Sequence, residues 1–454
     1  MSQFNWQFTH LHISILTHSH IMRYYSTNRQ SPIASLQEAV VKGLAPDKGL
    51  YMPEKINTLP ADFFETIDQL SFQEIAYRVA DAFFGEDIDT KTLKKIVYET
   101  LNFETPGVKV EDDIYSLELF HGPTSAFKDV GARFMARLLS YFIKKQGQTD
   151  VNVLVATSGD TGSAVANGFL GVEGIHVYVL YPKGLVSEIQ EKQFTTLGQN
   201  ITALEIDGTF DDCQRIVKSA FMDEELNAHL NLTSANSINV ARFLPQAFYY
   251  FNAYAQLKKA GKADQMVVCV PSGNFGNITA GLFGKRMGLP IKRFIAANNK
   301  NDIFLQYLQT GTYSPRPSVS TLANAMDVGD PSNFARVLDL YKGSHEKICN
   351  DISGFRYLDD QIAEAVKSCY QTTGYLLDPH GACGYLGLKD GLHKGETGVF
   401  LETAHPAKFV DTVEAILQEK VAIPEKLQAF MHGQKLSIEL SKEFVDFKEF
   451  LLKK

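Results

Sequence analysis

Five short segments of the chain carry side chains that could do chemistry, and the first contains an unusual lysine. Lys128 lies among small, polar and aromatic residues in the segment HGPTSAFKDVGARF, which begins at His121 after an apolar run. A lysine amine attacks a carbonyl carbon only after losing its proton, and partial burial favours that loss by lowering its pKa. Lys128 is therefore a candidate for covalent attachment to a carbonyl compound. The alternative is a surface lysine that opens a helix, with Asp129 near the positive end of the helix dipole.

The second segment, PSGNFGN at 271–277, is a candidate anion site. It lies between an apolar run and a pattern that predicts a helix. Gly273 and Gly276 allow backbone N–H groups to converge on an anion, and the start of a helix adds its dipole. The segment lacks the Gly-Lys-Ser/Thr ending of a P-loop and is not a GxGxxG motif. A tight strand-to-helix turn without a ligand remains the alternative.

Two further segments offer groups that bind anions. ATSGDTG, at 156–162, suits a substrate carboxylate or, alternatively, an N-cap. Its hydroxyl groups belong to Thr157, Ser158 and Thr161. SANSINVAR, at 234–242, suits a phosphate, because the planar fork of an arginine matches phosphate oxygens. Its candidate ligands are Asn236, Ser237 and Arg242, and its alternative reading is a capped helix start with a solvated arginine.

The fifth segment, LETAHPAKF at 401–409, places Thr403 directly after a run that reads as a buried strand. Its hydroxyl group could meet a ring nitrogen, or the segment could simply be a strand end broken by Pro406. A covalent lysine, an anion site and such a hydroxyl are together the three contacts that pyridoxal phosphate (PLP) needs. The segment that contains Arg242 leaves a second anion site for a phosphorylated substrate.

Alternating apolar runs and helical patterns position these segments. The runs are 151–156, 176–181, 201–206, 266–270, 294–297 and 399–402, and helical patterns follow three of them, at 187–197, 211–222 and 277–287. A further helical pattern covers 241–260. This alternation predicts parallel sheets with helices on both faces, in which ligands bind at the carboxyl ends of strands. Three of the five segments are expected at such ends. For the segments with Lys128 and Arg242, the sequence does not show whether they follow a strand.

The expected fold is α/β, with two parallel-sheet lobes and a small N-terminal helical domain. Residues 22–105 are expected to form the helical domain, and residues 151–262 the smaller α/β lobe. Residues 106–150 and 263–454 are expected to form the larger, cofactor-binding lobe. Residues 1–21, with four histidines in two HxH pairs, read as a disordered extension or as sequence upstream of a start at Met22, with metal binding as the alternative.

The composition is that of an ordinary globular protein. The chain has 454 residues, of which 44% are hydrophobic, and a formal net charge of -8. This charge argues against nucleic-acid or anionic-membrane partners, which attract basic surfaces. No stretch of 18 apolar residues exists, and the five cysteines form no CxxC pair, which fits a reducing compartment. We expect a cytoplasmic enzyme without a metal, a monomer or homodimer, that acts on a small molecule.

Taken in order, HGPTSAFKD, ATSGDTG, NSIN..R, PSGNFGN and ETAHPAKF resemble the threonine synthase family, in its bacterial and fungal branch. The stretch 24–53 is similar to the opening of that family, and the resemblance extends from about Met22 to the C-terminus. It implies a fold-type II PLP enzyme, related in architecture to the tryptophan synthase β subunit. The implied activity is a lyase reaction that converts O-phospho-L-homoserine and water into L-threonine and phosphate, the last step of threonine biosynthesis.

The resemblance also implies roles for individual residues. Lys128 holds PLP, and Thr403 faces its pyridine nitrogen. The residues expected around the PLP phosphate are Gly273, Asn274, Phe275, Gly276 and Asn277. By the same resemblance the phosphate of the substrate is bound by Asn236, Ser237 and Arg242, with Lys183 of the YPKG segment as a further phosphate ligand. The hydroxyl groups of Thr157, Ser158 and Thr161, which suit a carboxylate, complete the expected substrate site. Many relatives carry an asparagine that faces the 3′-oxygen of PLP, whereas this chain has Asp160 in that segment, so this contact stays unassigned.

Two other functions would use the same residues. A phospho-lyase of this family would eliminate phosphate from a related phosphorylated amino alcohol without making threonine, and only its product would distinguish it. A non-catalytic phosphate-binding α/β protein would be colourless and would not react with borohydride.

Overall fold

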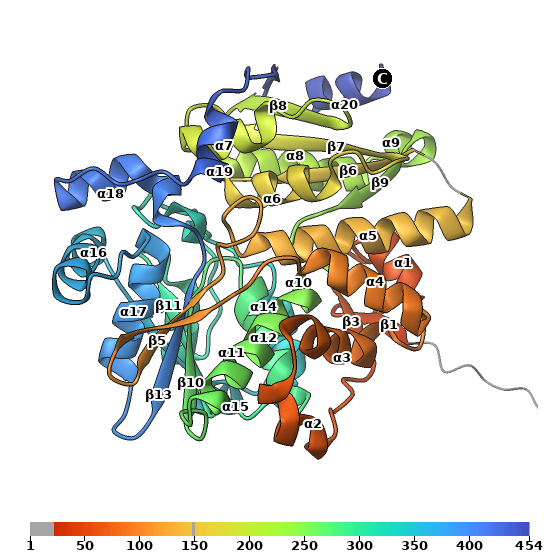
Figure 1. Cartoon of the computed structure of the whole chain (residues 1–454). Coiled ribbons are helices and arrows are strands. Elements are labelled where there is room, and N and C mark those ends of the chain that lie inside the picture. Colours follow the sequence, from red (N-terminus) through yellow and green to blue (C-terminus); the bar gives the residue numbers. More distant parts are fainter. Residues whose placement is uncertain (1–21, 148–149, 454) are drawn as a thin grey trace, which may run out of the picture.

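Two largely parallel β-sheets organise the chain, as the computed structural model in Figure 1 shows for residues 22–147 and 150–453. The larger sheet has six strands, and only its edge strand β4 pairs antiparallel. In spatial order its strands are β12 (Ile352–Arg356), β11 (Arg293–Asn298), β10 (Met266–Pro271), β13 (Thr397–Glu402), β5 (Ile114–Glu118) and β4 (Gly107–Glu111). Strands β10 and β13 are buried along their whole length, as expected for central parallel strands.

The smaller sheet has five strands, all parallel. In spatial order they are β14 (Ser437–Ser441), β8 (Ile201–Asp207), β7 (Ile175–Pro182), β6 (Val151–Ala156) and β9 (Asn231–Ser234). The sequence prediction placed residues 437–454 in the larger lobe, but the C-terminal stretch returns to this sheet. There β14 pairs with β8, and α20 (Phe444–Leu452) packs against α8 (Phe210–Met222). Apolar residues such as Phe447, buried in the core of this lobe, hold α20 in place.

The N-terminal region is helical, as predicted, but it also contains a small antiparallel sheet. Its strands are β1 (Arg23–Ser26), β2 (Ala34–Ser35) and β3 (Tyr51–Pro53). Its helices are α1 (Leu36–Lys42), α2 (Ala61–Thr66), η1 (Ile67–Gln69), α3 (Phe72–Phe84) and α4 (Thr90–Thr100). Residues 1–21, including their histidine pairs, lie outside the described residues.

Helix α5 (Lys128–Gln146) connects these parts, because it packs against α6 (Asp160–Phe169) of the smaller lobe and against α1 and α4 of the N-terminal region. The single helix predicted over 241–260 is instead α10 (Val240–Phe243), η2 (Leu244–Gln246) and α11 (Ala247–Lys259). Pro245 has no N–H to donate and therefore interrupts the regular helical bonding.

The remaining helices lie beside the two sheets (Figure 1). Those around the smaller sheet are α6 (Asp160–Phe169), α7 (Glu188–Thr195) and α9 (Glu224–His229), with α8 and α20. Those of the larger lobe are α12 (Gly276–Arg286), α13 (Ile303–Thr310), η3 (Asn324–Met326), α14 (Phe334–Leu340), α15 (His345–Asp351), α16 (Asp359–Thr373), α17 (Pro379–Gly391), η4 (Pro406–Phe409), α18 (Val410–Leu417) and α19 (Glu425–Met431). Within the described residues, none of the helices combines the length and apolar character that crossing a membrane requires.

A fully buried arginine joins the N-terminal sheet to the larger lobe. The guanidinium group of Arg336 donates to the carbonyl oxygens of Tyr51, at 3.1 Å, and Ile238, at 2.6 Å. It also donates to the Ser237 carbonyl oxygen at 3.1 Å and lies 4.0 Å from the ring centroid of Phe243. Arg336 therefore supplies donors to carbonyl groups from two separate stretches of backbone, at Tyr51 and at 237–238.

We expect Arg336→Met to lower the free energy of unfolding by about 3 kcal/mol or more, because it leaves the buried Tyr51 carbonyl group and two partly buried carbonyl groups without donors. Arg23→Met is the matched control, since Arg23 makes only an exposed ion pair with Glu54, and such pairs contribute about 0–1 kcal/mol. Urea denaturation of both variants measures the difference. Equal effects of the two substitutions would contradict a structural role for Arg336.

Candidate active site

One pocket collects most of the residues singled out in the sequence. It lies between the two sheets, where segments that follow β5, β6, β9, β10 and β13 come together. The segments containing Lys128 and Arg242, whose settings the sequence left open, therefore also follow the carboxyl ends of strands. The predicted residues that line it are Lys128, Ser158, Thr161, Asn236, Ser237, Arg242, Gly273, Asn274, Phe275, Gly276, Asn277 and Thr403.

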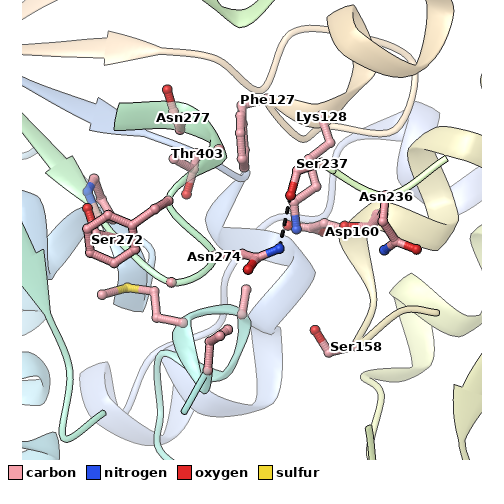
Figure 2. A pocket seen from close by; sticks show the side chains of 18 of the residues that line it. Phe127, Lys128, Ser158, Asp160, Asn236, Ser237, Ser272, Asn274, Asn277 and Thr403 are labelled. Carbon is pink, nitrogen blue, oxygen red and sulfur yellow. Dashed lines mark hydrogen bonds between the residues drawn. The ribbon is translucent and has the colours of Figure 1, made fainter. Parts of the chain in front are cut away.

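Lys128 is the first residue of α5, and its side chain enters the pocket in the region of Ser237 and Asp160 (Figure 2). The backbone around it is fixed on both sides. The N–H of Phe127 donates to the Thr403 carbonyl oxygen at 2.8 Å, and the Arg242 guanidinium donates to the Lys128 carbonyl oxygen at 3.1 Å. The side chain thus emerges from a rigid stretch of chain.

Burial lowers the pKa of the Lys128 amine to about 8. The Asp160 carboxylate opposes this shift, whereas the positive charges of Arg242 and Lys408 add to it. A pKa near 8 leaves a useful fraction of the amine unprotonated at neutral pH, as a nucleophile or a proton acceptor requires.

A buried ion pair stands beside this lysine. The ammonium group of Lys408 lies 2.6 Å from the Asp160 carboxylate and donates to the Thr124 carbonyl oxygen at 2.8 Å. Gln190 donates to the same carboxylate at 2.8 Å. Burial alone would raise the pKa of Asp160, but the neighbouring Lys408 and Lys128 outweigh it and hold the pKa below its ordinary value. Asp160 is therefore a carboxylate anion, and Lys408 joins the larger lobe to the smaller one at the pocket.

Residues 273–277, which we call the anion cradle, form the turn from β10 into α12. Phe275 adopts a left-handed backbone with φ of 63°, which turns the chain into the helix. The cradle is closely packed: a Cβ atom on Gly273 would lie 2.9 Å from the Met326 Cα atom, and one on Gly276 would lie 3.0 Å from the Ser237 Cβ atom. At both positions only glycine leaves the surrounding chain undisturbed.

Asn277 adds a side-chain donor to the anion cradle. Its Oδ1 atom accepts from the Tyr250 hydroxyl at 2.8 Å, while its Nδ2 atom is buried without a hydrogen-bond partner in the described structure. An orphaned donor at the start of a helix fits a phosphate group. Together with the amine of Lys128 and the hydroxyl of the largely buried Thr403 in the same pocket, these donors fit PLP.

The second predicted anion site is also at this pocket. Arg242 is buried, and burial lowers the pKa of its guanidinium to about 10, so it keeps its charge. Its Nε atom donates to the Ala235 carbonyl oxygen at 2.7 Å, and no carboxylate of the described residues forms an ion pair with it. Asn236 bonds to the backbone of Ala156, and Ser237 accepts from Asn274 at 2.9 Å. The guanidinium charge is thus held at the pocket by carbonyl groups alone.

Two residues predicted to contact the substrate do not line this pocket in the described structure. The Thr157 hydroxyl accepts from the N–H groups of Gly159 at 2.9 Å and Gly162 at 2.8 Å, and so shapes its own turn. Lys183 is half-exposed and forms an ion pair with Glu439 of β14 at 2.8 Å. That pairing depends on the return of the C-terminus to the smaller sheet, which the sequence did not predict.

The sequence analysis also missed several residues of the site. His380 and residues 325–328 line the pocket, and Lys408 forms an ion pair with Asp160. Lys408 lies within the LETAHPAKF segment that was singled out for Thr403 alone. A sequence signal for His380 exists in Asp378-Pro379, an N-cap followed by a proline at the first helical position, which together mark the start of a helix.

Comparison with known proteins agrees with this site. The family profile described as "Pyridoxal-phosphate dependent enzyme" matches residues 99–403. Those described as "Threonine synthase N terminus" and "Threonine synthase, C-terminal" match residues 23–101 and 382–451.

Individual relatives cover nearly the whole chain. The threonine synthase of Haemophilus influenzae is 45% identical over 95% of this chain and 100% of its own length. The crystal structure of threonine synthase from Escherichia coli is similar with a TM-score of 0.90 at 42% identity, covering 95% of this chain and 100% of that one. The PLP-bound threonine synthase from Brucella melitensis is similar with a TM-score of 0.88 at 35% identity, covering 95% and 98%. This chain therefore belongs to the threonine synthase family of pyridoxal-phosphate-dependent enzymes.

Proposed function

We propose that this protein is a threonine synthase, which converts O-phospho-L-homoserine and water into L-threonine and phosphate with PLP as its cofactor. The observation that carries the proposal is one pocket that joins an amine of lowered pKa to two regions whose donors suit an anion. A cofactor phosphate and a substrate phosphate account for both. The identity with threonine synthases over nearly the whole chain supports the same reaction.

The proposed cofactor site consists of Lys128, the anion cradle and Thr403. Bound PLP supplies an electron sink for the substrate. Lys128 would hold the cofactor covalently, and its uncharged amine would take and return protons at the substrate carbons. The backbone N–H groups of the cradle and the Asn277 amide hold the cofactor phosphate, and Thr403 offers its hydroxyl to the pyridine nitrogen.

The proposed substrate site lies on the side of the pocket that faces the smaller lobe. Arg242 binds the phosphate of the substrate with help from Asn236 and Ser237. Ser158 and Thr161, at the start of α6, bind its carboxylate, because a helix N-terminus favours an anion. We leave Thr157 and Lys183 out of this site, since neither side chain reaches the pocket.

The phospho-lyase alternative uses the same pocket, and its product distinguishes it. Incubation of the PLP-loaded protein with O-phospho-L-homoserine should release phosphate and L-threonine in equal amounts. Phosphate release without threonine would overturn the proposed reaction and favour simple elimination. We further propose a cytoplasmic monomer or homodimer, in keeping with five unpaired cysteines and the acidic net charge.

We expect Lys128→Ala to abolish threonine formation, because both covalent attachment of the cofactor and proton transfer are lost. Borohydride reduction followed by peptide mapping should place the pyridoxyl group on Lys128. Lys145→Ala, at the exposed end of the same helix, is the control and should remain active. A label on any other lysine would show that the cofactor is bound elsewhere.

We expect Arg242→Ala to raise KM for O-phospho-L-homoserine about tenfold or more, the equivalent of one charge-assisted hydrogen bond. The dissociation constant for PLP should change much less. Arg242→Lys should restore only part of the loss, because its ammonium lacks the planar fork. Arg78→Ala, an exposed arginine paired with Glu74 on α3, serves as control. Loss of PLP with an unchanged KM would instead assign Arg242 to the cofactor.

We expect Lys408→Met to raise the pKa of Lys128, because it removes a positive neighbour and leaves the negative charge of Asp160 uncompensated. The readout is the rate at which an amine-reactive ester labels Lys128 in the apoprotein. In the wild type this rate should rise with pH with a midpoint near pH 8, and in the variant the midpoint should lie at higher pH. Lys145→Met, about 25 Å away along α5, should leave the midpoint unchanged. A midpoint equal to that of the wild type in Lys408→Met would exclude this influence.

A further inference from the structure

Three ionisable side chains are buried together at the start of α17, behind the pocket. They are Asp378, the N-cap of that helix, His380 in its first turn, and Glu402 at the end of β13. None of them is more than 2% exposed. The reaction described above gives no role to any of them, although His380 lines the pocket and Glu402 immediately precedes Thr403.

Each of the two carboxyl groups has one satisfied and one unsatisfied oxygen. Oε1 of Glu402 accepts the backbone N–H of Asp378 at 2.7 Å. Oδ1 of Asp378 accepts both the backbone N–H and the ring Nδ1–H of His380, each at 2.6 Å. Oε2 of Glu402 and Oδ2 of Asp378 are buried without any hydrogen-bond partner in the described structure. Two ionised carboxylates with unpaired, buried oxygens are strongly unfavourable, whereas one proton between these oxygens satisfies both.

The hydrogen bonds indicate which group holds that proton. Asp378 has two N–H donors on one oxygen, which favours its ionised form, whereas Glu402 has one. Glu402 also lies beside Glu118, its direct neighbour on strand β5. Burial, and then the neighbouring carboxyl groups of Asp378 and Glu118, raise the pKa of Glu402 well above its ordinary value.

The other ionisable groups around the pair have partners of their own. Glu118 on β5 bonds to the His121 ring at 2.7 Å and accepts from the Tyr375 hydroxyl at 3.0 Å. His405 follows β13, and burial lowers its pKa to about 4, so it brings no charge. Asp327 lies near enough to His380 to interact with it electrostatically, and it accepts from Asn299 at 2.8 Å. Within the described residues, no ion pair neutralises Glu402.

The hydrogen bonds continue from this pair to the wall of the pocket. Nε2 of His380 accepts the backbone N–H of Ala325 at 3.1 Å, so the neutral ring carries its proton on Nδ1 and donates it to Asp378. Ala325 belongs to η3, which covers Gly273 of the anion cradle: its carbonyl oxygen would lie 3.0 Å from a Cβ atom on that glycine. The chain of bonds from Glu402 therefore ends where the cofactor phosphate is expected.

We propose that Glu402 is a neutral acid that donates its proton to Asp378, and that the chain Glu402–Asp378–His380 positions η3 over the anion cradle. Glu402 is then a positioning residue, since it acts through His380 and Ala325 and does not line the pocket. The proposal rests on the proposed function only in that the cradle binds the PLP phosphate. Its tests use the state of a carboxyl group, the stability of the protein and PLP binding, all independent of the product formed.

The first test is the infrared spectrum of the full-length apoprotein at pH 7 to 8. A neutral acid should give the carbonyl band of a protonated carboxyl group, shifted in D2O and absent from Glu402→Gln. This variant has nearly the same shape, and its amide can donate to Asp378 as the protonated acid does. A wild-type spectrum without that band at pH 7 would overturn the proposal, whether or not any variant folds.

The second test is the pH dependence of folding. A carboxyl group whose pKa is raised by folding contributes its full stability below its unfolded pKa and loses that contribution as the pH rises towards its folded pKa. Relative to the wild type, Glu402→Gln should therefore become more stable as the pH rises from 5 to 8, with the ratio of folding constants rising up to about tenfold per pH unit. Urea denaturation at each pH measures this ratio. A ratio that does not change with pH would contradict a neutral Glu402.

The third test separates positioning from general stability. Glu402→Leu removes both the donor to Asp378 and the acceptor for its N–H, and should raise the dissociation constant for PLP about fivefold to thirtyfold, the range for one or two buried hydrogen bonds. Glu402→Gln should bind PLP within about twofold of the wild type, as expected when a neutral donor replaces a neutral donor. Equal PLP affinity in Glu402→Leu and the wild type would show that the chain does not act on the cradle.

Discussion

The site depends on one constraint: an amine must lose its proton inside a pocket that also has to attract phosphate groups. Burial provides the first property, since it lowers the pKa of Lys128 to about 8. Fixed cations provide both, because Arg242 and Lys408 favour the uncharged amine and make the pocket attractive to anions. The Asp160 carboxylate acts against both effects, which explains why Lys408 lies within 2.6 Å of it. Without that ammonium, the negative charge would act on Lys128 alone.

The buried carboxyl groups around the pocket are accommodated in two different ways. Asp160 remains ionised because a lysine from the other lobe meets it, and burying such a pair is tolerable only when further hydrogen bonds satisfy both partners. Glu402 has no such partner in the described structure, and a proton serves instead. The first arrangement places charge at the pocket and ties the two lobes together. The protonated Glu402 leaves its own carboxyl group uncharged at the strand end that carries Thr403, and it still fixes the start of α17.

Local sequence patterns predicted the parts of this molecule that depend on local physics. The run at 151–156 coincides with β6, and the two glycines of the anion cradle stand where a Cβ atom would meet neighbouring chain. The resemblance to a known family then assigned Lys128, Arg242 and Thr403 to a single site, and all three line one pocket. What the sequence did not predict are contacts between residues far apart in the chain. His380 meets Ala325 only because α17 packs beneath η3, and no periodic pattern encodes that.

Lys183 is a second case in which a contact between residues far apart in the chain could not be predicted from the sequence. The family resemblance implied that Lys183 is a phosphate ligand, and its place directly after β7 agrees with that, because carboxyl ends of parallel strands face the crevice. The C-terminal strand β14, however, adds to the outer edge of that sheet and presents Glu439 to it. A charge that would otherwise be available to a ligand is therefore neutralised more than 250 residues further along the chain. Arg242 avoids this outcome because its guanidinium donates to carbonyl groups and pairs with no carboxylate of the described residues, so its positive charge remains available in the pocket. The difference between a binding cation and a structural one is thus decided by whether the fold brings a carboxylate to it.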